Sequence, residues 1–421
     1  MMPMPDEIAL RNPTADEFRR FIAPLSIAFN RRMTDEEIES DRRTIELDRF
    51  VGALDGDAVV GCGGAYSFRL SIPGGEVGAA GITAVGVLPS HRRRGILRQM
   101  MTWWFEQART RGEPVAILWA SEAAIYQRFG YGPATQQTFL EAPTDRIRFL
   151  RPVEMPGRIR IVEPDEALRS FPPIYDALRA EAPGSIQRSE GRWRDELLAD
   201  AGWSRADQGD KVLVVLERDG EASGYAIYRQ KPDWDLNGPK GVVTVHEVAA
   251  LDPVAEQAIW EWLFSIDLIS TVKGWRGPAP HPLQLMVTEP RRLATRVNDG
   301  MWLRIIDLAA ALESRAYAGG GTLRLDVTDA FWSANAGRWE LSVPASAGST
   351  PAGGARVGRI GAATDVDLAL DISDLAAVYL GAFRFADLAR AGRVRECRPG
   401  GLAAADALFL TARRPGIPTM F

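Results

Sequence analysis

Hydrophobic residues change their spacing repeatedly along the first third of the chain, and the changes predict alternating strands and helices. Residues 82–87 form an apolar, partly β-branched run that is typical of a buried strand. From Ile96 to Phe105 the apolar residues recur at helical spacing, and residues 114–120 are again apolar throughout. We therefore expect a strand, a loop, a helix and a second buried strand between Gly81 and Ala120.

The flanking residues extend this pattern into an α/β domain over residues 1–151. Thr14 and Thr34 are good N-caps for two helices. The turn Asp55-Gly56-Asp57 separates two strands, and Pro73-Gly74-Gly75 ends the meander that follows them. The ranges of the further elements are strands at 8–11, 49–54, 58–65 and 66–72 and a short helix at 123–129.

Two more segments follow. Residues 152–290 repeat the α/β order, with helices expected at 167–180, 190–201 and 253–267, strands at 211–218, 222–230 and 241–251, and a further element at 283–287. Residues 291–421 alternate strands at 322–327, 339–343 and 365–372 with helices at 376–380 and 403–409, around a Gly/Ala/Pro-rich loop at 344–361 that we expect to be mobile. The pattern predicts an α/β protein of three domains.

Composition narrows the class of protein. The chain has 421 residues, of which 46% are hydrophobic and 25% charged, as in globular proteins with sizeable cores. The formal net charge of −5 gives no indication of binding to nucleic acid or to an anionic membrane. No apolar run approaches the ~20 residues of a membrane span, and the start of the chain is unlike a signal peptide. The two cysteines, Cys62 and Cys397, lie far apart, so we expect a reduced, cytoplasmic protein.

The loop between the predicted strand and helix carries the first candidate chemistry. Three consecutive arginines, Arg92, Arg93 and Arg94, precede Gly95 and the helix that begins near Ile96. The unpaired N–H groups and positive dipole of a helix N-terminus favour phosphate, and guanidinium groups add charge. The alternative is a solvated basic turn. His91 lies in the same loop, whereas His246 and His281 have no second ligand at metal spacing and are expected to be structural.

The same residues carry a family resemblance. The spacing Arg92-x-x-Gly95-x-Leu97 resembles the acetyl-CoA pyrophosphate loop of the GNAT acetyltransferases, although Leu97 replaces the usual small residue. The longer strings PSHRRRGILR and SEAAIYQRFGYGPAT resemble the Eis branch of these enzymes. The resemblance implies two tandem GNAT domains, the second degenerate and without cofactor, and a C-terminal sterol-carrier-like domain; a lipid-binding role for the last domain is a weak expectation.

The resemblance also implies the site. Acetyl-CoA, with no metal, is expected to contact the residues of the central strand, the loop and the next strand end, namely Val85, Gly86, Val87, Arg92, Arg93, Arg94, Gly95, Ile96, Leu97, Arg98, Ser121 and Glu122. Backbone N–H groups of Val85–Val87 are candidates to hold the oxyanion. Tyr126 is implied to be the general acid, against the alternative that it only packs, as is expected of Tyr131. The free carboxylate of the final residue, Phe421, is implied to be the base.

The resemblance implies the identity of the acetyl acceptor less directly than it implies the site. A cationic amine, aminoglycoside- or polyamine-like, fits the net negative charge, and Asp35 and Glu36 on one predicted helix are minor candidates to attract it. Met420 and Ala84 stand where some aminoglycoside-acetylating relatives carry an acidic and an aromatic residue. Acetylation of protein lysines and a non-catalytic acyl-CoA or lipid sensor are the alternatives. The resemblance further implies a homo-oligomer, a hexamer.

Overall fold

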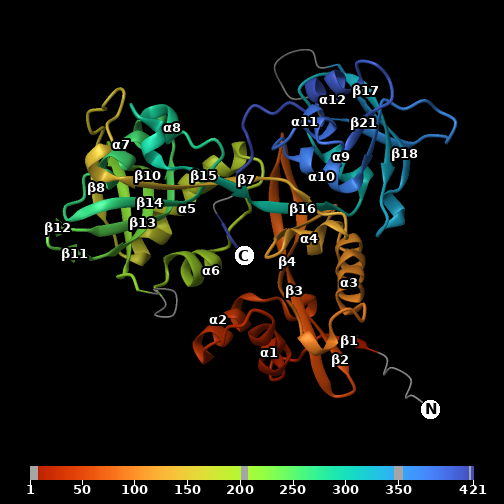
Figure 1. The fold of residues 1–421 in the computed structure, drawn as a ribbon, viewed down its shortest axis with the longest axis horizontal. Helices are drawn as coiled ribbons and strands as arrows, with labels where there is room; N and C mark the ends of the chain where they lie inside the picture. The colour runs from red at the N-terminus through yellow and green to blue at the C-terminus, as the bar shows by residue number, and fades with distance from the viewer. Residues whose placement is uncertain (1–7, 201–206, 346–353, 417–418) are drawn as a thin grey trace. The chain divides into compact units, whose positions relative to one another are not determined.

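The computed structural model describes residues 8–200, 207–345, 354–416 and 419–421 (Figure 1). Its residues separate into two compact units. The first contains residues 1–134, 301–411 and 421, and the second contains residues 135–300 and 412–420. The units therefore divide the chain at other residues than the predicted domains 1–151, 152–290 and 291–421.

The first unit contains a seven-stranded sheet in the order β1-β2-β3-β4-β5-β16-β6. Its elements are β1 (Ala9–Arg11), α1 (Phe18–Ala28), α2 (Asp35–Thr44), β2 (Val51–Asp55), β3 (Ala58–Ile72), β4 (Gly75–Val87), α3 (Ile96–Thr110), β5 (Val115–Trp119), α4 (Ala123–Gln127), β6 (Gly132–Pro133) and β16 (Met301–Ile305). Strands β4 and β5 are parallel, and β16 inserts antiparallel between β5 and β6.

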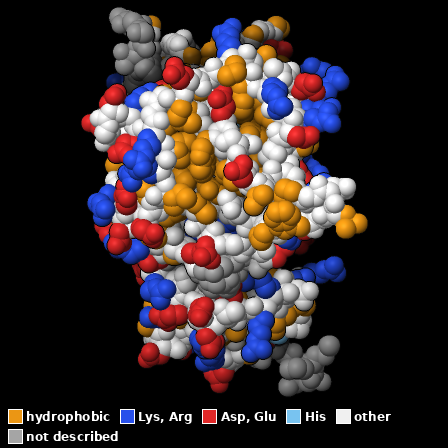
Figure 2. All heavy atoms as spheres, turned by 90° about the vertical axis from the view of Figure 1, so that its left-hand side faces the viewer, with side chains coloured by type: hydrophobic (Ala, Val, Ile, Leu, Met, Phe, Trp, Pro, Cys, Tyr) orange, Lys and Arg blue, Asp and Glu red, His pale blue; other side chains and the backbone are white. Residues whose placement is uncertain are grey.

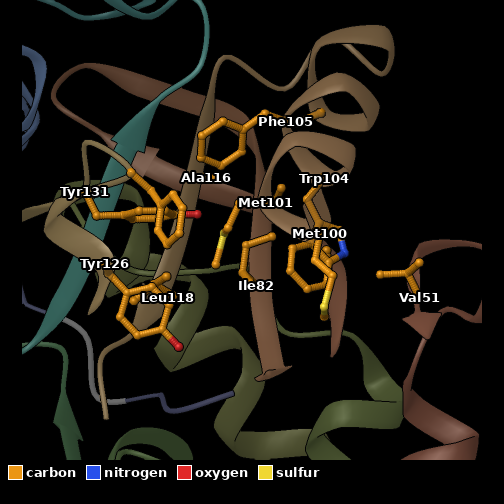
Figure 3. Packing of buried hydrophobic residues seen from close by; sticks show 14 of the residues in the cluster. Val51, Ile82, Met100, Met101, Trp104, Phe105, Ala116, Leu118, Tyr126 and Tyr131 are labelled. Carbon is orange, nitrogen blue, oxygen red and sulfur yellow. The ribbon is translucent and has the colours of Figure 1, made fainter. Parts of the chain in front are cut away.

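Helix α3 builds the core of this sheet. Its buried side chains Met100, Met101, Trp104 and Phe105 pack against Ile82, Ala116 and Leu118 of the two parallel strands (Figure 3). The apolar residues that recur at helical spacing in the sequence therefore form the buried face of the helix. At the start of α2, Thr34 forms the predicted N-cap in a full capping box. Thr14 does not cap α1 as predicted, because the helix begins only at Phe18, with Glu17 at the cap position, and the Glu17 carboxylate instead accepts from Thr14.

The first unit also contains the C-terminal five-stranded sheet, in the order β19-β18-β17-β20-β21. Its elements are α9 (Leu308–Ser314), β17 (Gly321–Thr328), β18 (Gly337–Val343), β19 (Arg356–Arg359), β20 (Leu368–Asp371), α10 (Ile372–Tyr379), α11 (Phe385–Arg390), β21 (Val394–Glu396) and α12 (Gly401–Leu408). Strand β19 forms inside the predicted loop 344–361, of which residues 346–353 lie outside the described residues. A fully buried ion pair, Arg304 of β16 with Asp329 at 2.5 Å, ties this part to the first sheet.

The second unit repeats the layout of the first sheet, in the order β15-β7-β14-β13-β10-β9-β8. Its elements are β7 (Gln136–Pro143), β8 (Arg158–Ile161), α5 (Pro164–Glu181), α6 (Glu190–Arg192), a π-helix (Trp193–Leu198), β9 (Lys211–Arg218), β10 (Glu221–Lys231), the short pair β11 (Trp234–Asp235) and β12 (Gly238–Pro239), β13 (Gly241–Ala250), α7 (Pro253–Phe264), β14 (Ile269–Pro278), α8 (Leu283–Met286) and β15 (Arg296–Asp299). Residues 201–206 lie outside the described residues, and they include only the last residue of the helix predicted at 190–201.

Strand β14 is missing from the sequence prediction. Its sequence, ISTVKGWRGP, mixes two glycines, a lysine and an arginine among its apolar residues and so lacks the continuous apolar run of β5. The strand is nevertheless central, because it pairs with β13 on one side and β7 on the other. Tertiary pairing has overridden a weak local pattern here.

Several large hydrophobic side chains are exposed on the surface of the second unit. Ile161, Trp234, Leu236, Leu251 and Leu268 are all exposed. Figure 2 shows hydrophobic side chains gathered on one face of the molecule among mixed charges. None of the helices within the described ranges combines the length and the hydrophobicity of a membrane-spanning segment.

Candidate active site

The site begins where β4 and β5 part. The parallel ladder runs from the pair Ala79–Val115 to the pair Ile82–Leu118, and β5 ends at Trp119. Strand β4 continues to Val87 without a β5 partner among the described residues. The predicted oxyanion donors Val85–Val87 therefore lie on a stretch whose edge toward β5 is not used in the sheet.

A bulge re-aims this stretch of β4. The register against β3 shifts between Cys62 and Gly64, and Ala84 takes a left-handed backbone conformation with φ of 52°. A non-glycine residue adopts this conformation rarely and at a cost in free energy, and such bulges turn strands near active sites. The bulge was not predicted, since an alanine in an apolar run gives no local signal for positive φ.

The loop that follows leads into the N-terminus of α3, where an anion site is expected. Gly95 is the N-cap of α3 with φ of 81°, and no side chain caps the helix. The first N–H groups of a 15-residue helix are thus left for a ligand, and they carry the positive end of the helix dipole. Ile96 is buried in the core and Leu97 packs against it, which anchors the first turn.

The arginines of the loop have different surroundings. Arg94 forms an ion pair with Asp55 at 2.9 Å, and His91 Nε2 contacts the same carboxylate at 3.2 Å. Both partners hold the pKa of Asp55 below its usual value, Arg94 more strongly. Arg92 and Arg93 are exposed. Asp55 therefore orders the loop from the β2–β3 turn, a role that the sequence did not reveal because Asp55-Gly56-Asp57 also reads simply as a tight turn.

Arg98 is the third residue of α3 and contacts a residue outside the loop. Its guanidinium group sits 4.9 Å from the ring centroid of Phe331, a residue of the C-terminal sheet region. A cation–π contact of this kind stabilises packing. A phosphate-binding role for Arg98 stays a prediction.

Tyr126 lies in α4, next to the end of β5. The side chain is only 7% exposed, and in Figure 3 its ring lies beside Leu118. Burial raises the pKa of Tyr126, a hydrogen bond with the Ser121 hydroxyl lowers it, and the Glu122 carboxylate raises it. The phenol is therefore protonated at neutral pH, as a general acid must be, and Ser121 and Glu122 lie at the strand end where they were expected.

Tyr131 provides the contrast. It is fully buried, and its hydroxyl has no hydrogen-bond partner among the described residues. Burial raises its pKa far above the usual value. Tyr131 thus behaves as the packing residue that its place in the sequence predicted.

The last residue, Phe421, belongs to the first unit and packs on the central strands. Its ring lies edge-on to Phe68 of β3 with a centroid distance of 4.8 Å. A Cβ atom on Gly81 of β4 would clash with the Phe68 ring and would lie 3.2 Å from the Phe421 ring, so the glycine leaves room for this pair of rings. Gly81 precedes Ile82, the last β4 residue paired with β5, so Phe421 is seated where the two strands part. Phe68 and Gly81 are site residues that no motif in the sequence had indicated.

The residues before Phe421 are held inside the second unit. Arg188 is fully buried and donates to both oxygens of Glu247, at 2.9 and 2.7 Å, and to the Thr419 hydroxyl, at 2.9 and 2.5 Å. Its guanidinium group lies 3.7 Å from the Tyr175 ring centroid. Arg192 donates to the Met420 carbonyl at 3.2 Å. We call Arg188, Glu247 and Thr419 the tail clamp; nothing in the sequence links these distant residues.

Helix α2 carries Asp35 and Glu36, the two candidates for attracting a cationic amine, and both are exposed to solvent. Asp35 pairs with Arg19, but its side chain is 84% exposed, and Glu36 is exposed as well. Surface pairs of this kind contribute little free energy. A role in attracting an amine stays a prediction for both.

Comparisons with known proteins agree with this geometry. Descriptions of an acetyltransferase (GNAT) domain match residues 9–134 and 184–305, and a sterol carrier protein domain matches residues 308–418. An uncharacterized N-acetyltransferase of Streptomyces avermitilis is 41% identical over 92% of both chains. The N-acetyltransferase Eis of Mycobacterium tuberculosis is 34% identical over 96% of both.

A solved structure agrees over the full length. Eis1 from Mycobacterium abscessus superposes with a TM-score of 0.82 at 31% identity, covering 98% of this chain and 100% of that one. The predicted order of two GNAT domains and a sterol-carrier-like domain is confirmed, and GNAT acetyltransferases use acetyl-CoA as the acetyl donor. The chain belongs to the Eis family of GNAT N-acetyltransferases.

Proposed function

We propose that this enzyme transfers acetyl from acetyl-CoA directly to an amine of a cationic small molecule, aminoglycoside- or polyamine-like. Phe421 serves as the base and Tyr126 as the acid. The observation that carries the proposal is the seating of Phe421 on Phe68 and Gly81, at the point where β4 and β5 part. An aromatic residue fixed there brings its main-chain carboxylate to the place where the family resemblance puts the thioester.

The cofactor is proposed to lie along the unused edge of β4. Its diphosphate is bound by the N–H groups of Gly95, Ile96 and Leu97 and by Arg92 and Arg93, with Arg94 and Arg98 lending charge from their ion-pair and cation–π positions. Ser121 and Glu122 border the acyl arm from the β5 side. This assignment is supported by the uncapped N-terminus of α3.

The chemistry follows from these positions. The amine nitrogen attacks the thioester carbon while the Phe421 carboxylate takes its proton, directly or through a water. Backbone N–H groups of Val85–Val87 hold the oxyanion. When the tetrahedral intermediate collapses, the C–S bond breaks and Tyr126 protonates the leaving thiolate. The products are an N-acetylated amine and free CoA, and neither cysteine takes part.

A one-residue extension tests the base. A glycine added after Phe421 converts its carboxylate into an amide and moves the charge by about 3.5 Å. Hydrogen-bond reach is about 2.6–3.2 Å, so the extended enzyme is expected to lose turnover while keeping its fold and its acetyl-CoA affinity. A glycine added at the N-terminus is the matched control. Equal acetyl transfer by the two proteins would remove Phe421 from the mechanism.

A panel of acceptors tests the substrate class. The release of CoA thiol is measured with aminoglycosides, polyamines and a lysine peptide at equal amine concentration. Turnover only with the peptide would replace the proposed acceptor by protein lysine, and acetyl-CoA binding without transfer to any amine would favour a sensor. The cytoplasmic location and the hexameric assembly stay predictions.

A further inference from the structure

The second unit contains a cavity of about 340 Å³ at the place equivalent to the acetyl-CoA cleft of the first. Strands β13 and β14 pair in parallel from Gly241–Ile269 to Val245–Gly274 and then part. The cavity lies beyond this point, between the strand ends and the helices α5 and α7. Its size falls within the range of small-molecule sites.

The cavity lacks a place for the diphosphate of CoA. Asp252 occupies the N-terminus of α7, where its carboxylate accepts from the N–H groups of Val254 and Ala255, both at 2.9 Å. Arg218 pairs with the same carboxylate at 2.7 Å. The helix end that binds phosphate in a GNAT loop thus already holds an anion of the protein, which agrees with the degenerate character predicted for this domain.

The cavity itself combines apolar walls with basic side chains. Its walls include Leu178, Val245, Ala249 and Trp260, and its basic lining residues are Arg179, Arg276, Arg413 and Arg414. Asp176 and Glu181 balance Arg179 and Arg413. The two acidic lining residues add little negative charge, since Glu247 is paired with buried Arg188 and burial raises the pKa of Glu256.

A buried hydrogen-bond donor also faces the cavity. His281 is 6% exposed, lines the cavity and lies edge-on to Trp260 at 5.4 Å. Its Nδ1 accepts from the Leu283 N–H at 3.2 Å, so the proton of the neutral ring is on Nε2. Burial lowers the pKa of His281 to about 4 and keeps the ring neutral at pH 7. Among the described residues the ring hydrogen-bonds only through Nδ1, so Nε2 can donate to a ligand in the cavity that His281 lines.

We propose that this cavity binds a small monocarboxylate with an apolar body. The carboxylate accepts from His281 Nε2 and lies among the arginines, while the apolar body packs against Val245, Ala249 and Trp260. A monoanion fits better than a phosphate dianion, because Asp176 and Glu181 already balance Arg179 and Arg413. The second GNAT unit is thereby a ligand-binding domain in its own right, independent of acetyl transfer.

The experiment uses the full-length enzyme saturated with CoA, so that the acetyl-CoA cleft is occupied. Octanoate and 3-phenylpropionate are titrated by calorimetry and by thermal unfolding, each beside its uncharged primary amide. The acids are expected to bind and to raise the melting temperature, and the amides to bind at least about fivefold more weakly because the charge-assisted hydrogen bonds are lost. Equal binding of acid and amide, or no binding of either acid at millimolar concentration, would overturn the proposal.

Two variants locate the bound acid. His281→Asn keeps an acceptor for the Leu283 N–H but removes the Nε2 donor, and Arg414→Gln removes one exposed charge. Each is expected to weaken octanoate binding about fivefold. Arg390→Gln, an exposed arginine of α11, is the control for a change of charge alone. Unchanged affinity in both cavity variants, with folding intact, would place the acid elsewhere and contradict the assignment.

Discussion

Tyr126 and Tyr131 lie five residues apart, both are buried, and their rings are 6.1 Å apart edge-on, yet their hydroxyls differ. The Tyr126 hydroxyl interacts with Ser121, whereas that of Tyr131 has no partner among the described residues. Sequence spacing alone left the role of Tyr126 open between acid and packing. The surroundings of the two hydroxyls now provide a matched pair for an experiment.

Tyr126→Phe is expected to lower turnover by about 10²–10⁴-fold, because it removes the proton and keeps the ring. Acetyl-CoA affinity should hold. Since burial raises the pKa of Tyr126 above 10, the wild-type enzyme should keep its acid protonated throughout the neutral range. Initial rates and calorimetry measure both quantities, with Tyr131→Phe as the control that retains turnover. A loss below about threefold in Tyr126→Phe, small beside the usual effect of a general acid, would make this residue a packing residue.

Substitutions at Gly95 can separate the effect of a negative charge on acetyl-CoA binding from the effect of backbone conformation. Its φ of 81° disfavours most side chains, but no atom lies within 4 Å of the position that a Cβ would take, and Asp and Asn tolerate the left-handed region. Gly95→Asp places a negative charge against the cofactor phosphates and is expected to weaken acetyl-CoA binding more than about tenfold, at roughly 1.4 kcal/mol per factor of ten. Gly95→Asn, of the same shape and without the charge, should bind nearly as wild type. Equal affinities of the two variants would argue against a phosphate at this helix end.

At the scale of elements, the described residues at the very end of the chain, 419–421, lie outside any helix or strand, and a side-chain clamp holds Thr419. Thr419 is 2% exposed and its hydroxyl is held by Arg188, which also pairs with Glu247. The tail residues next to the proposed base are therefore fixed in the second unit by one buried arginine. We expect Arg188 to act as a positioning residue for the tail residues that precede Phe421.

Thr419→Val tests that role without leaving a buried charge unpaired, because the Arg188–Glu247 pair is retained. A shift of the terminal carboxylate by about 1 Å costs up to about 10²-fold in rate. The kcat is expected to fall about tenfold or more with unchanged KM for acetyl-CoA. Thr322→Val, at an exposed position of strand β17, is the control. A structural role alone would lower the melting temperature and leave kcat intact.

At the scale of the whole molecule, buried histidines make stability depend on pH. Burial lowers the pKa of His281 to about 4, and burial together with Arg229, Lys211 and Arg276 lowers that of His246 to about 4, against an opposing effect of Glu247. In the unfolded chain both titrate near 6.5. Between these values the unfolded state binds more protons, so the free energy of unfolding falls as the pH drops from 6.5 toward 4.

Between about pH 7 and pH 5, each histidine is expected to lower the free energy of unfolding by about 2 kcal/mol. Urea unfolding at the two pH values measures it, and His281→Asn should show about half of the histidine contribution. Carboxylates also change the free energy of unfolding in this pH range. The test is therefore the difference in pH dependence between the wild type and the variant. The same pH dependence in both proteins would show that His281 does not contribute.

The sequence by itself determined the local elements and the family. The apolar runs of β4 and β5, the helical spacing of α3 and the capping box at Thr34 are local patterns, and each element formed where its pattern predicted it. The motif around Arg92–Gly95 likewise identified the family, since the strand, the loop and the helix are contiguous in the chain. Local structure of this kind follows from neighbours within a few residues.

Tertiary structure alone decided the rest. Strand β14 formed against its weak pattern because β7 and β13 pair with it, and β16 entered the first sheet from 182 residues beyond β5 (Trp119 to Met301). Asp55, the seat of Phe421 and the tail clamp join residues far apart in sequence. Such contacts depend on where the backbone brings charges and rings together, and no spacing along the chain encodes that position.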